Sequence, residues 1–122
     1  MNMFGFARGE VFSINNKKLS KDINSKRSWF SNEPENTTWL NVSEVIIISN
    51  DIVNKFSSVV SVLPIVKSLV GYSVTSIDDI EIIKRTYLEE KVGAVSGSTL
   101  EKLNDNFRSE NHKAIPIKCQ EK

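Results

Sequence analysis

The chain is poor in the residue types that build covalent or metal-bound frameworks. Its 122 residues include one cysteine, Cys119, and one histidine, His112. A single thiol cannot close an internal disulfide, and a histidine-based metal site or catalytic triad needs more partners than these. We therefore expect Cys119 to be a free thiol in a reducing compartment, and we expect neither a metal nor a cofactor.

Long apolar runs and an excess of one charge are also missing. No stretch approaches the roughly 20 apolar residues of a membrane-spanning helix, and the apolar start of the chain is too short for a secretory leader. Sixteen basic and fifteen acidic residues leave a net charge of +1, which gives no overall attraction to nucleic acid. The sequence thus predicts one cytoplasmic domain over residues 1–122, with no membrane contact.

What the chain does contain is a series of short, β-branched, apolar segments. These segments predict strands at residues 10–14, 44–49, 59–66, 72–77 and 80–88. The run at residues 44–49 is nearly all apolar, which is typical of a central strand covered on both faces. Pro64 marks a bulge or an end of its strand.

Helices are expected at only two places. Residues 49–51 predict a turn that caps a short helix at residues 52–56. A longer helix is expected at residues 96–110, where Ser98 and Glu101 have the spacing of a capping box. The tail at residues 111–122 is either a short extra strand or disordered. This order predicts a mainly β fold with attached helices: a small β-barrel or a curved antiparallel sheet, with a C-terminal helix.

A polar segment at residues 15–42 separates the first two expected strands and is long for such a connection. Its basic and aromatic residues stand close together: Lys17, Lys18, Lys21, Lys26, Arg27, Trp29 and Phe30. Single-stranded RNA binding requires cations along the phosphates and aromatic rings on the bases, at roughly 1–3 kcal/mol per stacked base. The alternative is a solvated, mobile loop whose two aromatic rings pack on the sheet.

Three segments resemble the MazF/PemK family of toxins in their order and spacing. They read "ARGEVFSI" at residues 7–14, "VIIISNDIVNKFSSVVSVLPIV" at residues 45–66 and "KRTYLEEKVGAVSGSTLEKL" at residues 84–103. In that family, Arg-Gly-Glu or Arg-Gly-Asp leads into the first strand, an Asn-Asp turn follows the second, and an Arg-Thr pair follows a later strand. The chain is similar to the family over most of residues 7–108.

The resemblance implies both a fold and a function. The implied fold is the small SH3-like barrel shared by MazF-type and CcdB-type toxins, and the implied assembly is a homodimer. The implied function is that of the toxin in a type II toxin–antitoxin system. Such a toxin is a hydrolase, an endoribonuclease that cuts single-stranded RNA such as mRNA without a metal. A cognate antitoxin would restrain it by laying a disordered acidic tail in the RNA groove.

The chain departs from the family where the resemblance places the catalytic residues. The family's arginine before the second strand and its Thr or Ser at the end of the third are matched by Ser43 and Val66. Ser43 carries no permanent charge, and Val66 has no hydroxyl. Metal-free RNA cleavage must deprotonate the 2′-hydroxyl, stabilise the phosphorane and protonate the 5′-oxygen. Either other residues perform these tasks or the activity has been lost.

The candidate substitutes lie in the long segment and just past the third strand: Arg27, Glu35, Lys67 and Ser68. Arg27 would act as a displaced catalytic arginine, Lys67 and Ser68 would replace the missing charge and hydroxyl, and Glu35 would accept a proton. The alternative for Glu35, Lys67 and Ser68 is an ordinary turn position. By the same resemblance, the pair Arg85 and Thr86 is structural.

Two other functions stay open beside the endoribonuclease. One is a non-catalytic binding module of the same fold, either a poison of another protein or a regulatory or phage-borne interaction protein. The other is an RNA-binding protein that does not cleave. CcdB-type toxins end on a short segment with a tryptophan, and this chain ends "IPIKCQEK" without one, so the sequence does not support a gyrase poison. Acidic residues dominate residues 78–90, which predicts that charge is separated into two regions.

Overall fold

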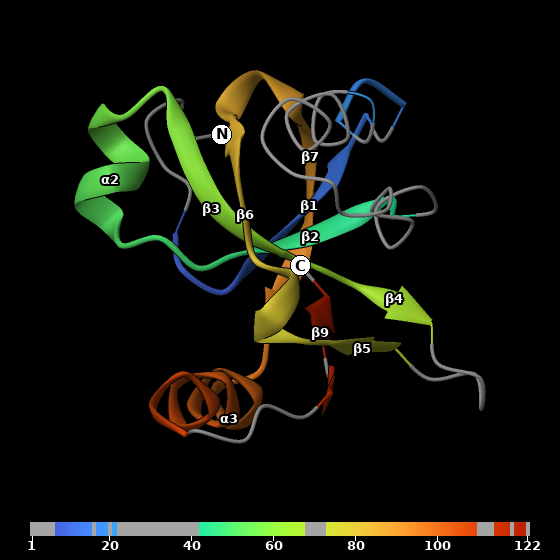
Figure 1. The fold of residues 1–122 in the computed structure, drawn as a ribbon, viewed down its shortest axis with the longest axis vertical. Helices are drawn as coiled ribbons and strands as arrows, with labels where there is room; N and C mark the ends of the chain where they lie inside the picture. Colours follow the sequence, from blue (N-terminus) through green and yellow to red (C-terminus); the bar gives the residue numbers. More distant parts are fainter. Residues whose placement is uncertain are drawn as a thin grey trace, which may run out of the picture.

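The structure is a computed structural model, and it describes residues 7–15, 17–19, 21, 42–67, 73–109, 114–117 and 119–121. The described strands form two antiparallel sheets with helices attached (Figure 1). The larger sheet contains β1 (Glu10–Ile14), β2 (Glu44–Ile47), β3 (Val59–Pro64), β6 (Glu81–Lys84), β7 (Leu88–Val95) and β9 (Cys119–Glu121). Its strand order is β6–β3–β2–β1–β7–β9.

The smaller sheet contains β4 (Val66–Lys67), β5 (Ser73–Thr75) and β8 (Ile115–Pro116) in the order β4–β5–β8. Within the described residues, the sheets are accompanied by α2 (Asp51–Phe56), the C-terminal α3 (Gly97–Arg108) and the 3₁₀ turns η2 (Ile77–Asp79) and η3 (Arg85–Tyr87). The predicted mainly β fold with a C-terminal helix is confirmed. Among the described strands, the larger sheet is open and curved rather than closed into a barrel.

Strand β2 lies at the centre of the core. Val45, Ile46 and Ile47 are fully buried, because successive side chains of a strand point to opposite faces and both faces are covered. Val45 and Ile47 join a cluster with Phe12, Ile14, Leu19, Val42, Val60, Val62 and Ile83. Ile46 packs on the other face with Val11, Ile48, Leu63, Ile77, Val95, Leu103 and Ile115. Helix α3 reaches this second cluster through Leu103, so the helix covers one face of the sheet.

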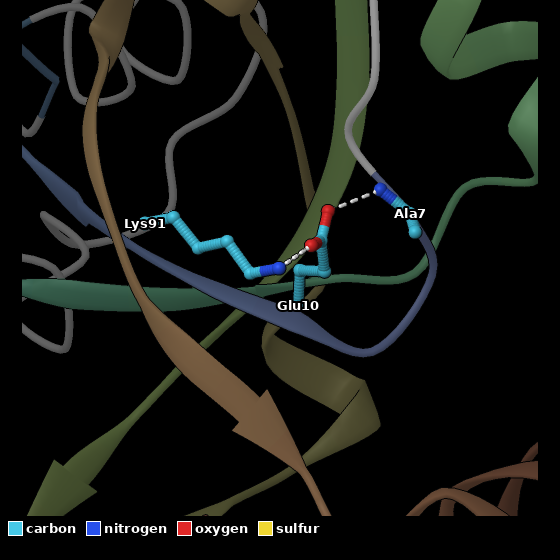
Figure 2. Close-up of polar contacts among 3 residues, drawn as sticks. All are labelled: Ala7, Glu10 and Lys91. Atoms are coloured by element: carbon cyan, nitrogen blue, oxygen red, sulfur yellow. Dashed lines mark hydrogen bonds and ion pairs between the residues drawn. The ribbon is translucent and has the colours of Figure 1, made fainter. Parts of the chain in front are cut away.

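The Arg-Gly-Glu segment ties the start of β1 to β2 and β7. Gly9 has φ +92°, its N–H donates to the Ile47 carbonyl at 2.7 Å, and its carbonyl accepts from the Val95 N–H at 2.9 Å. The Glu10 carboxylate accepts from the Ala7 N–H at 2.5 Å and pairs with Lys91 of β7 (Figure 2). This motif therefore holds the sheet together at the position where the chain enters it.

The turn into α2 is built on buried side-chain hydrogen bonds. Asn50 is the N-cap, as predicted, and its side chain accepts from the Val53 N–H at 3.0 Å. Asn54 is buried and donates to the Ser49 carbonyl at 2.9 Å, while the Ser49 hydroxyl donates to the Asn54 side-chain oxygen. The same hydroxyl accepts from the Ser61 N–H of β3 at 3.2 Å. These bonds fix α2 against the sheet.

Two predictions differ from the structure. The N-cap of α3 is Ser96 rather than Ser98, because the Ser96 hydroxyl accepts from the Thr99 N–H at 3.2 Å and the helix begins at Gly97. The expected strand at residues 80–88 is split by η3, whose Arg85 donates to the Ser57 carbonyl at 3.2 Å. That contact secures the C-terminal end of α2, so Arg85 has the expected structural role. For the tail at residues 111–122, the first predicted alternative is found, because the tail forms the short strands β8 and β9.

Replacing Gly9 by alanine should lower the free energy of unfolding by about 1–2 kcal/mol, because a left-handed backbone is strained for any residue with a Cβ. An added Cβ would meet its nearest neighbour at 3.6 Å, so crowding adds little. Gly97→Ala is the matched control, since nothing lies within 4 Å of its added Cβ and its φ is not left-handed. Urea unfolding measures both variants, and equal stability of the two would contradict the strained turn.

Candidate nucleic-acid interface

The N-terminal end of β2 is where the sequence placed the missing catalytic residues. The Ser43 carbonyl accepts from the Ile14 N–H at 3.0 Å, so Ser43 lies beside the end of β1. Its side chain is exposed. The carbonyl of the next residue, Glu44, accepts from the Ile65 N–H at 3.0 Å. These two bonds place Ser43 between the end of β1 and the segment that follows β3.

Val66 lies just past the strand that pairs with β2. The register pairs Val45 with Pro64, and the bond between Glu44 and Ile65 continues it by one residue. At Val66 the chain enters β4, which pairs with β5 in the smaller sheet. Val66 is partly buried and packs against the first core cluster. Of Ser43 and Val66, the two positions that the resemblance assigns to catalysis, neither supplies a charge or a strong acid through its side chain.

A short helical turn at the start of the long segment lies at the same end of the sheet. Asn15 accepts backbone bonds from Leu19 at 3.2 Å and, through its side chain, from Lys18 at 3.3 Å. Its own N–H donates to the Tyr87 carbonyl at 3.3 Å. Leu19 is 1% exposed and belongs to the first core cluster. The beginning of the predicted loop is therefore anchored to the core rather than solvated along its whole length.

Three lysines of this segment are exposed around the anchored turn. Lys17, Lys18 and Lys21 all have exposed side chains. Among the residues that the structure describes, no carboxylate forms an ion pair with any of them. We call Lys17, Lys18, Lys21 and Ser43 the lysine interface. Its charge is available to a phosphate backbone.

The predicted separation of acidic and basic residues into two regions is only partly correct. Ile14 pairs with Leu88, so the exposed carboxylates of Glu89 and Glu90 follow directly in β7 and lie near the end of β1. The Ser13 hydroxyl accepts from the Glu90 N–H at 3.1 Å. Acidic and basic residues therefore adjoin at this end, because antiparallel pairing brings residues 14 and 88 together.

Several predicted site residues lie outside the described residues: Lys26, Arg27, Trp29, Phe30, Glu35 and Ser68. Lys67 lies in β4, where it pairs with Ser73 directly after Val66. Within the described part of the chain, no group of three or more His, Cys, Asp or Glu side chains could hold a metal ion.

The opposite end of β2 opens on a pocket of about 690 Å³ that the sequence did not indicate. Ile48 and Ser49, which follow β2, line it together with residues of α3 and with Arg8. Arg8 donates to the side-chain oxygen of Asn104, a contact across 96 positions of sequence. The only sequence signal for this site is the i, i+4 spacing of Leu100, Asn104 and Arg108 on α3. We call the site that these residues form with Arg8 the arginine pocket.

Comparisons with known proteins leave the resemblance as a prediction. No protein-family model, no curated protein and no solved structure matches this chain. Among the described residues, no helix is both long and apolar enough to cross a membrane.

Replacing Leu19 by alanine should lower the free energy of unfolding by about 2–5 kcal/mol, because a fully buried leucine leaves a cavity. Lys18→Ala, one position earlier and exposed, should change stability by no more than about 0.5 kcal/mol. Thermal or urea unfolding distinguishes the two. A Leu19 variant as stable as the Lys18 variant would show that the turn is not anchored in the core.

Proposed function

We propose that the chain is a toxin of the MazF/PemK type that binds single-stranded RNA at the lysine interface and cleaves it without a metal. The observation that carries the proposal is the position of Lys17, Lys18 and Lys21. They are exposed, no described carboxylate pairs with them, and the turn that carries them begins beside Ser43, one of the two positions that the resemblance assigns to catalysis. Lysines at such a site would bind the phosphates and fix the strand across the end of β2.

The chemistry would be an internal transfer at phosphorus. The 2′-oxygen, on losing its proton, forms a bond to phosphorus as the bond to the 5′-oxygen breaks. The products are a cyclic phosphate and a 5′-hydroxyl, so no water or metal enters the step. In this proposal Arg27 stabilises the charged phosphorane and donates the proton that the leaving 5′-oxygen takes up, while Glu35 accepts the 2′ proton. Lys67 and Ser68 provide the charge and hydroxyl that Ser43 and Val66 lack.

The remaining parts of the proposal follow the same resemblance. The toxin would work as a homodimer in the cytoplasm, and a cognate antitoxin would cover the lysine interface with an acidic segment. Lysines at the interface favour such a segment for the same electrostatic reason that they favour RNA.

A second candidate is a binding module of this fold that does not cleave. The observation that favours it is the identity of Ser43 and Val66, because neither side chain carries a charge and Val66 packs partly into the core. Neither an uncharged serine nor a valine can stabilise a phosphorane by charge. The module would bind RNA or a protein partner through the same lysines.

Long single-stranded RNA in excess chelator tests cleavage directly. The protein should give discrete fragments whose 5′ ends map to short sequences, and Arg27→Ala should abolish them. Lys102→Ala removes a positive charge from the exposed face of α3, and it should cleave like the original chain. RNA that is bound but stays intact would establish the non-cleaving module, and RNA that is neither bound nor cut would contradict both candidates.

The salt dependence of RNA binding tests the lysine interface separately. Each phosphate contact contributes about 0.7 to the slope of log affinity against log salt for single strands. Replacing Lys17, Lys18 and Lys21 together by glutamine should therefore reduce the slope by up to about 2. Filter binding between low and physiological salt measures it. An unchanged slope would place the RNA elsewhere.

A further inference from the structure

The arginine pocket brings two positive charges together without a carboxylate. Asn104 and Arg108 are one turn apart on α3, so they lie on one stripe of the helix. Arg8, from the turn before β1, donates to the Asn104 side chain, which sets its guanidinium beside that stripe. Both arginines line the pocket and both are exposed.

No compensating acid is present among the described residues. The residues described as lining the pocket include no aspartate or glutamate, and none of the described carboxylates pairs with Arg8 or Arg108. Arg108 gains from its place in the last turn of α3, and Asn104 holds Arg8. Neither contact neutralises the positive charge of the two arginines. Their guanidinium groups therefore repel each other, and a bound anion would stabilise the site.

The wall beside the two arginines is apolar and partly aromatic. Phe107 is 38% exposed and Ile80 is 42% exposed, and both line the pocket with Leu100. An exposed aromatic ring is a stacking surface for a planar base. A volume of about 690 Å³ is in the range that small ligands occupy.

We propose that the arginine pocket binds a nucleoside monophosphate, with the phosphate between Arg8 and Arg108 and the base against Phe107. Arginine is suited to this because its planar group donates several hydrogen bonds to phosphate oxygens. The nucleotide is either free or the phosphorylated end of an RNA, since both present the same group. The site lies at the opposite end of β2 from the lysine interface, and it does not depend on RNA cleavage.

Calorimetric titration of the full chain at low ionic strength tests the proposal with three probes: uridine 5′-monophosphate, uridine and inorganic phosphate. The monophosphate should bind at least about tenfold more tightly than either of the other two, because only it uses both the arginines and the ring. Phosphate that binds as tightly as the nucleotide would indicate an adventitious ion only and would overturn the proposal. So would the absence of nucleotide binding.

Charge-matched variants locate the site. Arg108→Gln should weaken nucleotide binding about tenfold or more, because a hydrogen bond between charged groups is lost. Lys102→Gln makes the same change of charge on the same helix but outside this pocket, and it should leave the affinity unchanged. Phe107→Leu keeps an apolar side chain and should weaken the monophosphate while leaving inorganic phosphate unaffected.

Equal losses of nucleotide affinity in Arg108→Gln and Lys102→Gln would mean that the nucleotide is attracted to a positive surface in general. That result would rule out the pocket as the binding site. Thermal unfolding checks that each variant is folded. Arg108 is exposed, and among the described contacts its side chain holds no other side chain in place. Its replacement should therefore leave the fold intact. A 5′-phosphorylated RNA that competes with the nucleotide, when its 5′-hydroxyl form does not, identifies an RNA end as ligand. Competition by neither RNA identifies the free nucleotide.

The two proposals fail separately. The lysine triple variant should lose RNA affinity and keep nucleotide affinity, whereas Arg108→Gln should do the reverse. Nucleotide binding that falls with the lysines and not with Arg108 would overturn the pocket, whether or not the chain cleaves RNA.

Discussion

Burial of β2 on both faces, together with its pairing along both edges, is the constraint on which the rest of the structure depends. Its side chains alternate between two core clusters, and β1 and β3 hydrogen-bond to its two edges. A one-residue slip would turn every buried side chain of β2 to the other face. The register of three strands is therefore fixed, and with it the residues that meet at each end of β2.

The two ends of β2 carry different chemistry. At the start of the strand, Ser43 lies beside the end of β1, where the lysine turn begins, and Leu19 anchors that turn in the core. At its end, Ile48 and Ser49 lead into the arginine pocket, which α3 closes from one side. The first end offers flexible point charges suited to a polymer backbone, and the second offers planar guanidinium groups suited to a single phosphate.

The sequence allowed the fold class, the central strand and the Asn50 cap to be predicted, because each has a local signal: a β-branched run or a cap residue before an apolar stretch. Leu19 could not be recognised as core, since a single apolar residue in a polar segment has no periodicity. Ser96 and Ser98 are both good cap residues, and only the packing of Thr99 decides between them. The contact of Arg8 with Asn104 joins distant positions, so no local pattern announces the pocket.

Amide chemical-shift mapping with a short 5′-hydroxyl RNA tests the central claim, that one end of β2 is the polymer site and the other is not. We expect the RNA to shift the amide resonances of Lys17, Lys18 and Ser43. The amide resonances of Asn104, Phe107 and Arg108 should stay unchanged. Shifts confined to α3, with none at residues 17–19 and 43, would contradict the claim.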